Sequence, residues 1–493
     1  MRRIAPLAAA ALLVWTGTAI GQPVIPESLV PGAFQNVVLR NSFNPSGAGA
    51  RGLGMGGAFI AVADDGTAAS FNPAGLSQLR RSELALVGFG DRLEATSQLD
   101  GQPFDDPLST DHGALDFAGL AVPFQVGGKN MTVQLSYQRS VDLFGEGDAL
   151  FLGGNVIDGD VVLFGGGVNA KQEGAFHTVS LSTAYQVTQR LSLGATLNYW
   201  IADWNVSGTS SFRLSIPDEG IPFTDIENRS FSQDQEYRAL NMNFGVLLKY
   251  PKLSVGGVLR LPFGSEYKAH ETGSVENLFE GTTPIDNSMR TTLHWPLSAG
   301  VGIAIRPVKG LTLAADYTAT QWSRTYLESV PGGYLGTGFL HDQDGNPIDT
   351  FVDRNFFDLE PASITETVNT SIWRAGGEYL IVTPAVVIPL RGGLYRDKSP
   401  VPQFQGESRR IEGFTFGTGL NFDRVVFDVA YEQRKSEGDV GVAIGLLRGA
   451  TAPSEEVKEQ RIVASLIYRF GSAGGEDPLK KFFRGIFVGP KED

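Results

Sequence analysis

The chain has 493 residues, with 40 Lys and Arg against 54 Asp and Glu, and its formal net charge is −14. The acidic excess argues against a nucleic-acid binder held by phosphate contacts, and the absence of cysteine excludes disulfides, thiolate metal sites and a lipid anchor on cysteine. Hydrophobic residues make up 42% of the chain and charged residues 19%, so the chain is far less apolar than a bundle of membrane-spanning helices.

Residues 1–21 have the layout of a secretory signal peptide. Two arginines precede an apolar stretch from Ala5 to Trp15, and the small residues Ala19 and Gly21 stand just before the expected cleavage site. The apolar stretch is shorter than the roughly 20 residues of a membrane-spanning helix. We therefore predict cleavage after residue 21 and export of either a soluble protein or an outer-membrane barrel.

Residues 22–81 are rich in glycine and alanine and lack the alternation of a strand. Because glycine permits close backbone packing and positive φ, we predict a compact plug, or hatch, between the leader and the first strand. Gly52, Gly54 and Gly57 match the spacing of a dinucleotide-binding fingerprint. The sequence before them, Asn-Pro-Ser-Gly, is not the buried strand that this motif requires.

From residue 82 to residue 470, segments of about ten residues alternate between apolar and polar side chains, as barrel strands do when they face lipid on one side and a lumen on the other. Leu193 and Leu197 share one face of such a segment, whereas Thr196 and Asn198 share the opposite face. The predicted strands are 82–93, 113–124, 130–140, 175–187, 190–206, 236–249, 253–265, 287–305, 310–326, 368–380, 385–397, 410–422, 424–436 and 459–470.

The connections between these segments alternate between long and short ones. Long loops on one side of the sheet and tight turns on the other are typical of bacterial outer-membrane barrels, and a closed sheet leaves no unpaired backbone edge in lipid. We therefore predict an all-β fold: a transmembrane antiparallel barrel of about fourteen strands over residues 82–470. Residues 471–493 are predicted to be a periplasmic tail. The short connections are 125–129, 188–189, 250–252, 306–309, 381–384 and 423.

Two separated regions carry motifs of a known family. The first holds GMGGA at 54–58, ADD at 63–65 and NPAGL at 72–76; the second ends in DKSPVP at 397–402. With these motifs the chain resembles the FadL-type outer-membrane transporters of long-chain fatty acids and hydrocarbons, which include the TodX-like toluene importers. The hatch residues that carry the resemblance are Gly54, Gly56, Gly57, Asp64, Asp65, Asn72, Pro73, Ala74 and Gly75.

The resemblance implies a route for substrate. Extracellular loops would capture the substrate, which would move to an apolar pocket against the hatch and leave sideways through a gap at an irregular third strand, here residues 130–140. Apolar clusters at 141–144, 149–152 and 162–164 could supply the capture site. Alternatively, these clusters pack the loops against one another.

Inward-facing arginines are the natural partners of a substrate carboxylate, because a guanidinium stays charged and offers two parallel N–H donors. Alternation along the strands places Arg391, Arg374 and Arg260 toward the lumen, with Tyr395 on the same face as Arg391. These four residues are the candidate substrate-binding residues.

The alternative role of these arginines is structural. They would pair with acids such as Glu378 and Asp428, and Asp64 and Asp65 of the hatch would bind arginines of the lumen. In that case the charges hold the hatch in place and do not touch substrate.

The sequence contains no motif of a catalytic site. The hydrolase, zinc-protease and P-loop signatures are absent, and Asp342–Asn346 lacks the bidentate glutamate of a calcium loop, so we interpret it as a polar turn. We predict no enzymatic activity, no cofactor and no metal.

The predicted protein is a monomeric outer-membrane barrel that contacts lipid and lipopolysaccharide and binds no nucleic acid. It would import long-chain fatty acids or other hydrophobic compounds by passive, ligand-gated diffusion. Two alternatives remain: a porin-like channel for polar solutes with an open lumen, and a structural or adhesion barrel whose loops bind a partner.

Overall fold

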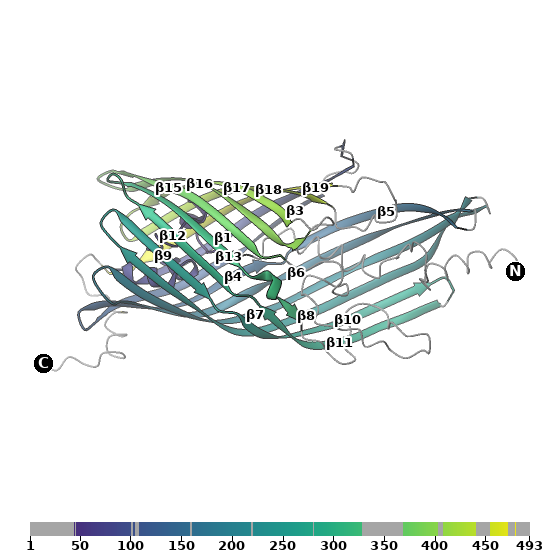
Figure 1. The fold of residues 1–493 in the computed structure, drawn as a ribbon, viewed down its shortest axis with the longest axis horizontal. Helices are drawn as coiled ribbons and strands as arrows, with labels where there is room; N and C mark the ends of the chain where they lie inside the picture. The colour runs from purple at the N-terminus through teal and green to yellow at the C-terminus, as the bar shows by residue number, and fades with distance from the viewer. Residues whose placement is uncertain are drawn as a thin grey trace.

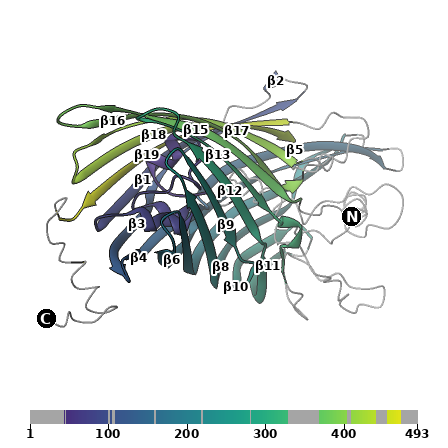
Figure 2. The ribbon, with the colours of Figure 1, turned by 60° about the vertical axis from the view of Figure 1, so that its left-hand side comes forward.

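The strands form one antiparallel sheet that closes on itself. The computed structural model describes residues 44, 46–99, 102–103, 108–157, 160–217, 220–279, 281–327, 368–402, 408–439, 454–471 and 479. The last strand pairs with the first along its whole length, which closes the sheet (Figures 1 and 2). The barrel has 14 strands, as predicted. The sheet has nineteen strand segments, because β9 with β10 and β11 with β12 are each one interrupted strand of the wall, and β2, β5 and β14 are additional segments. The strands are β1 (Glu83–Leu99), β2 (Gln102–Pro103), β3 (Leu108–Val126), β4 (Lys129–Asp142), β5 (Gly145–Ile157), β6 (Asp160–Gln186), β7 (Leu191–Ile216), β8 (Ile221–Lys249), β9 (Leu253–Arg260), β10 (Phe263–Asn277), β11 (Gly281–Trp295), β12 (Ser298–Ile305), β13 (Leu311–Thr320), β14 (Tyr326–Leu327), β15 (Thr370–Val382), β16 (Val387–Pro402), β17 (Ser408–Asn421), β18 (Val425–Asp439) and β19 (Ser454–Arg469).

The predicted strands are present, and many extend further toward the long connections. The β7–β8 hairpin has strands of 26 and 29 residues, more than twice the roughly 9–11 residues that cross a bilayer. Figure 1 shows β6, β7, β8, β10 and β11 projecting far beyond the half of the barrel that carries the short turns. The extensions were not predicted because cross-strand charge pairs, such as Arg213 with Asp225, replace apolar alternation there.

The connection after the third predicted strand was expected to be a loop, and that expectation was wrong. It is a hairpin of β5 and the first part of β6. Its consecutive apolar residues lack the alternation by which the other strands were recognised. Val162 is buried in a cluster with Leu214 of β7, and Phe164 is buried and pairs with Leu214 across the two strands. The side chains of 149–152 lie outside the described residues.

The wall has an apolar outer face and a polar inner face. On β7, Leu193 and Leu197 are 48% and 45% exposed, while Thr196 and Asn198 are 3% and 6% exposed. Since both pairs belong to one strand, the alternation in sequence is the alternation between the two faces of the barrel wall.

The N-terminal segment, residues 46–81, lies inside the barrel. It contains the short helix α3 (Ala50–Gly54) and the 3-10 helices η1 (Ala68–Ser70) and η2 (Pro73–Gln78). Helix η2 contacts β4, β6, β7 and β8, whereas α3 contacts β16, β17, β18 and β19. One segment can touch these separate parts of a closed wall only from within, and Figure 2 shows it in purple among the strands.

Backbone pairing between β3 and β4 stops partway along the wall. β4 pairs with β3 from Lys129 to Gln138, but beyond Gln138 its described residues pair with β6 alone, after an irregularity at Ser140. β3 continues to Leu108 and pairs there with β1. The third strand of the barrel is therefore irregular within the range where the resemblance implied a gap.

Several predicted features lie outside the described residues: the signal peptide, residues 22–43 of the predicted hatch, the Asp342–Asn346 turn and the tail after residue 471 except Leu479. In the part of the chain that the structure describes, no helix is long and apolar enough to cross a bilayer.

Candidate functional site

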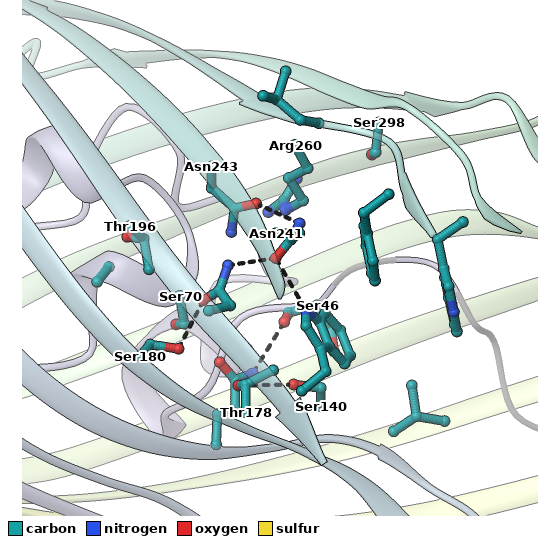
Figure 3. Close-up of a pocket in the computed structure, with 18 of the residues that line it drawn as sticks. Ser46, Ser70, Ser140, Thr178, Ser180, Thr196, Asn241, Asn243, Arg260 and Ser298 are labelled. Carbon is teal, nitrogen blue, oxygen red and sulfur yellow. Dashed lines mark hydrogen bonds between the residues drawn. The ribbon is translucent and has the colours of Figure 1, made fainter. Parts of the chain in front are cut away.

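A cavity of the lumen lies beside the N-terminal segment, and we call it the main cavity. It comprises about 900 Å³ of space, part of it open to solvent, and is bounded by Ser46, Ala69 and Ser70 of the segment and by inward-facing residues of the wall. These residues come from β4, β6, β7, β8 and the β9–β12 region, so one side of the barrel supplies most of the lining (Figure 3).

One wall of this cavity is a hydrogen-bonded row of polar side chains that crosses three strands. Ser180 Oγ donates to Asn198 Oδ1 at 2.7 Å, and Asn198 Nδ2 donates to Asn241 Oδ1 at 2.8 Å. Trp200 Nε1 donates to the same oxygen at 2.9 Å, and Asn241 Nδ2 donates to Asn243 Oδ1 at 3.3 Å. The row shown in Figure 3 fixes these side chains in place and turns polar atoms toward the cavity.

Three aromatic rings with nearly parallel planes form the adjoining part of the lining. The centroids of Phe263 and Trp295 are 6.1 Å apart at an angle of 3° between ring planes. Trp200 lies 5.8 Å from Phe263 and 5.9 Å from Trp295, at angles of 28° and 25°. We call these three residues the aromatic platform. Beyond it, Trp295 and Trp322 belong to a larger buried aromatic cluster that includes Phe176, Trp204, Tyr237 and Tyr267.

Two interruptions in neighbouring strands build this part of the lining. β9 ends at Arg260 and β10 begins at Phe263, and the residue before Phe263 is Pro262, which has no N–H for the strand ladder. Buried positions are even-numbered in β9 and odd-numbered in β10. The interruption therefore turns both Arg260 and Phe263 toward the lumen.

The neighbouring strand pair is interrupted at the same level. β11 ends at Trp295 and β12 begins at Ser298, with Pro296 between them. Phe263 pairs with Trp295, and Arg260 pairs with Ser298. The two aligned interruptions thus bring Arg260 and the aromatic platform into the lining of one cavity.

Arg260 forms no ion pair with another described residue, although it lines the cavity. Its Nη1 is buried and has no hydrogen-bond partner among the described residues, and the same holds for Trp295 Nε1. Arg260 is half-buried, and a cation withdrawn from water is unfavourable unless it is paired, so Arg260 is a candidate for binding an anionic group of a ligand.

Arg391 lies inside the barrel but is occupied. Its Nε donates to Glu378 at 2.8 Å and its Nη1 donates to Asp428 at 2.6 Å, and the residue is 7% exposed. Of the two roles considered for Arg391, the geometry favours the structural one.

Among the described residues, Asp64 and Asp65 form ion pairs with an arginine of the N-terminal segment and not with one of the wall. Asp64 and Asp65 both approach Arg51 of the N-terminal segment itself, at 2.6 Å and 3.5 Å, and Arg51 bonds Glu378 through Nε and Nη2, at 3.0 Å each. Burial disfavours the charge of Arg51, but the surrounding carboxylates outweigh it, so its pKa is raised well above the ordinary value. The sequence did not predict a role for Arg51, because Arg51 lies outside the strands and alternation along a strand cannot give its orientation.

Arg374 and Tyr395 line a second cavity of about 810 Å³, which Arg260 also lines. Arg374 packs on the segment, where a Cβ added to Gly57 would lie 3.0 Å from its Nε. Of the four predicted residues, the structure brings Arg260, Arg374 and Tyr395 to one cavity and leaves Arg391 outside its lining.

The hatch motif holds the segment against the wall. Gly56 has a φ of 67°, and a Cβ there would meet the backbone nitrogen of Leu394 at 2.9 Å. Asn72 Nδ2 donates to Ile60 O and Val246 O, and Asn72 Oδ1 accepts from Ala74 N. Pro73 and Ala74 lie against glycines of β7 and β8, and a Cβ on Gly75 would collide with Ala63. The motif residues thus make backbone contacts that a larger side chain would prevent.

Asn44 connects the segment with the downstream motif and was not predicted. Its Oδ1 accepts from Trp322 Nε1 at 2.9 Å and from Thr370 Oγ1 at 2.6 Å, and its Nδ2 donates to Asp397 Oδ1 at 2.7 Å. Asn44 lines both cavities. Its Nδ2 also donates to Lys398 O at 3.0 Å. No local signal marks Asn44, because these four hydrogen bonds depend on segments that are far apart in sequence. Within the described ranges no group of three or more histidines and carboxylates could hold a metal ion.

Comparison with known proteins supports the fold. No protein-family model and no curated protein sequence matches the chain. Among solved structures, a FadL homologue from Pseudomonas aeruginosa is 16% identical, with a TM-score of 0.55, and the toluene transporter TodX from P. putida is 14% identical, with a TM-score of 0.59. The monoaromatic hydrocarbon channel CymD is 14% identical, with a TM-score of 0.51. Each alignment covers 87% of this chain and 100% of the other. The chain therefore has the fold of FadL-type channels.

Proposed function

We propose that the protein is an outer-membrane channel for passive uptake of hydrophobic or amphipathic small molecules. The observation that carries the proposal is the content of the lumen: a packed N-terminal segment at one end, a buried aromatic cluster toward the other, and a cavity lined by both aromatic and polar groups between them. The similarity in fold to a toluene transporter and a monoaromatic hydrocarbon channel supports this assignment.

The orientation follows from the connections. Short turns face the periplasm in bacterial outer-membrane barrels, so the extended β7–β8 hairpin would project outward from the cell. The predicted signal peptide would direct export and would be cleaved after residue 21. Residues 22–81 would act as the hatch. Residues 82–470 form the proposed barrel domain, and 471–493 the proposed periplasmic tail.

Capture would begin at the extended strands. Leu143 is buried in the same cluster as Phe176, Trp204 and Trp295, which reaches the main cavity through Trp295. This cluster gives an apolar molecule contacts that water does not offer, and it supports a capture route from the extracellular end to the cavity.

Release would occur sideways through the wall. The region where β3 loses its pairing with β4 adjoins the main cavity, because Phe117, Gln138 and Ser140 belong to the cavity lining. Few backbone hydrogen bonds would have to break there for a ligand to enter the lipid phase. The irregular third strand thus supports the lateral exit implied by the resemblance.

Uptake of radiolabelled oleate and toluene by cells with and without the protein tests the proposal. We expect faster uptake of at least one compound when the protein is present. Ser180→Trp, which fills the cavity, should return uptake to the background rate. Val179→Trp places the same side chain on the outer face of β6, where Val179 is 41% exposed, and should leave uptake unchanged.

Two outcomes would contradict the proposal. Equal uptake with and without the protein would refute the proposed transport function. A large, stable single-channel conductance of the intact protein in a planar bilayer would instead favour a porin-like channel for polar solutes.

A further inference from the structure

We propose that the main cavity selects planar aromatic carboxylates over aliphatic carboxylates of the same carbon number and over neutral aromatic compounds. The proposal names a substrate class for the uptake function above and rests on it. Its basis is that Arg260 and the aromatic platform line the same cavity, at two aligned strand interruptions.

The unsatisfied groups at this corner of the cavity are hydrogen-bond donors. Arg260 Nη1 and Trp295 Nε1 are buried and have no partner among the described residues. Asn243 is the pairing partner of Arg260 across β8 and β9, and its Oδ1 is already engaged by Asn241, so its amide nitrogen is the group left to donate. An ionised carboxylate only accepts hydrogen bonds, and its negative charge would balance the positive charge of Arg260.

The aromatic platform has the shape that a flat ring requires. Three rings separated from one another by 5.8 to 6.1 Å cannot form a linear stack, because the outer pair would then be about twice as far apart. Their planes differ by 28° at most, so the platform presents similarly oriented faces. Offset stacking on such faces stabilises an aromatic ring beyond the burial of its area, whereas a flexible alkyl chain gains burial alone.

The spacing suits a carboxylate attached directly to a ring. Arg260 and Phe263 are three residues apart on one wall, a separation of roughly 10 Å at most along the strand direction, and the arginine side chain can span much of it. A carboxylate held by Arg260 would therefore leave its own ring over the platform.

The polar row disfavours a long aliphatic chain. Ser180, Asn198 and Asn241 line the cavity together with Thr178 and Thr196. Figure 3 shows Thr178, Ser180, Thr196 and Asn241 around it. An alkyl chain that covers such groups removes their water without replacing its hydrogen bonds. A small aromatic acid can occupy the platform and leave the polar row hydrated.

Calorimetric titration of the purified full-length protein in detergent tests the selection with three probes. The probes are 2-naphthoate, its neutral carboxamide, and undecanoate, which has the same number of carbon atoms as 2-naphthoate. We expect 2-naphthoate to bind at least about tenfold more tightly than either other probe. Only 2-naphthoate has both a carboxylate to pair with the guanidinium and an aromatic ring to stack on the platform. Equal or tighter binding of undecanoate would overturn the proposal.

Variants separate the two parts of the site. Arg260→Met should weaken 2-naphthoate about tenfold or more and leave the carboxamide nearly unchanged, while Trp295→Leu should weaken both and Trp295→Phe should restore most binding. The control is Arg290→Met, which makes the same change on β11 at a side chain that is 71% exposed and paired with Glu266, and it should bind like wild type. Circular dichroism checks that each barrel is folded. Unchanged 2-naphthoate binding by a folded Arg260→Met variant would refute the proposal.

The two proposals fail separately. If cells require the protein for toluene uptake but 2-naphthoate shows no preference in titration, the uptake function stands and the substrate class is wrong. If 2-naphthoate binds selectively but no probe enters cells faster, the binding site stands and the transport function is wrong.

Discussion

Two arginines of the lumen wall, Arg391 and Arg260, have opposite electrostatic surroundings. Arg391 lies where the N-terminal segment meets the barrel and bonds two carboxylates, one of which also holds Arg51. Arg260 faces a cavity and forms no ion pair with a described residue, and its Nη1 lacks a hydrogen-bond partner among them. The contrast separates two uses of one residue type: a buried guanidinium whose acceptors come from the protein stabilises structure, whereas one without them is suited to a ligand.

Removing Arg391 should have the largest effect on stability. Arg391→Met leaves Glu378 and Asp428 buried, with Arg51 the remaining cation at Glu378, and removing one partner of a buried ion pair costs about 3–5 kcal/mol. Urea unfolding in lipid vesicles should show a lower midpoint than wild type. An unchanged midpoint would mean that the network is hydrated and contributes little.

Gly56→Ala should be the next most damaging change. The positive φ of Gly56 disfavours any side chain, and the new Cβ would lie 2.9 Å from the nitrogen of Leu394; backbone strain of this kind costs about 1–3 kcal/mol before the collision is added. Hydrogen exchange of the segment should become faster. Gly127→Ala is the matched control, because Gly127 has a φ of 55° and nothing within 4 Å, so the difference between the variants isolates the collision.

Asp316→Ala should loosen one point of the same interface. Asp316 Oδ2 accepts from the backbone nitrogens of Phe59 and Ile60 at 2.7 and 2.9 Å, and leaving buried donors unsatisfied costs about 1–3 kcal/mol. Exchange protection of these two amides should fall, and Asp316→Asn, which keeps an oxygen acceptor, should retain most of it. Loss of protection throughout the barrel would show that Asp316 supports the wall and not the segment.

Arg260→Met should have the smallest effect on stability. Since no described carboxylate depends on Arg260, the variant removes an unpaired charge, and its unfolding free energy should stay within about 1 kcal/mol of wild type or rise. The same urea titration as for Arg391→Met measures it. A loss as large as that of Arg391→Met would erase the distinction between the two arginines.

Much of the barrel could be predicted from the sequence, because lipid on one side and a lumen on the other impose a period of two on each strand. The positions of Leu193 and Thr196 in the alternating pattern are enough to assign them to the outer and inner faces of the wall. The extensions of β7 and β8 were missed because charged pairs interrupt that period, and the β5–β6 hairpin was missed because its apolar residues are consecutive.

The site was harder to predict than the barrel. The alternation of residues along a strand shows which side of the wall a side chain faces, but not which residue it contacts. The alternation places both Arg391 and Arg260 in the lumen. It gives no orientation for Arg51 or Asn44, because these residues lie outside the strands. Pro262 and Pro296 were visible in the sequence, but their alignment depends on the register between β10 and β11.

The sequence by itself determined the strand count, the sidedness of the wall and the small residues of the N-terminal segment, because each depends on a local repeat or on the absence of a side chain. Only the tertiary structure decided which arginine is paired, that Asn44 ahead of the first motif region bonds Asp397 of the second, and that Arg260 lines the same cavity as three aromatic rings. These outcomes depend on distances between residues that are far apart in the chain, which are fixed only when the sheet closes.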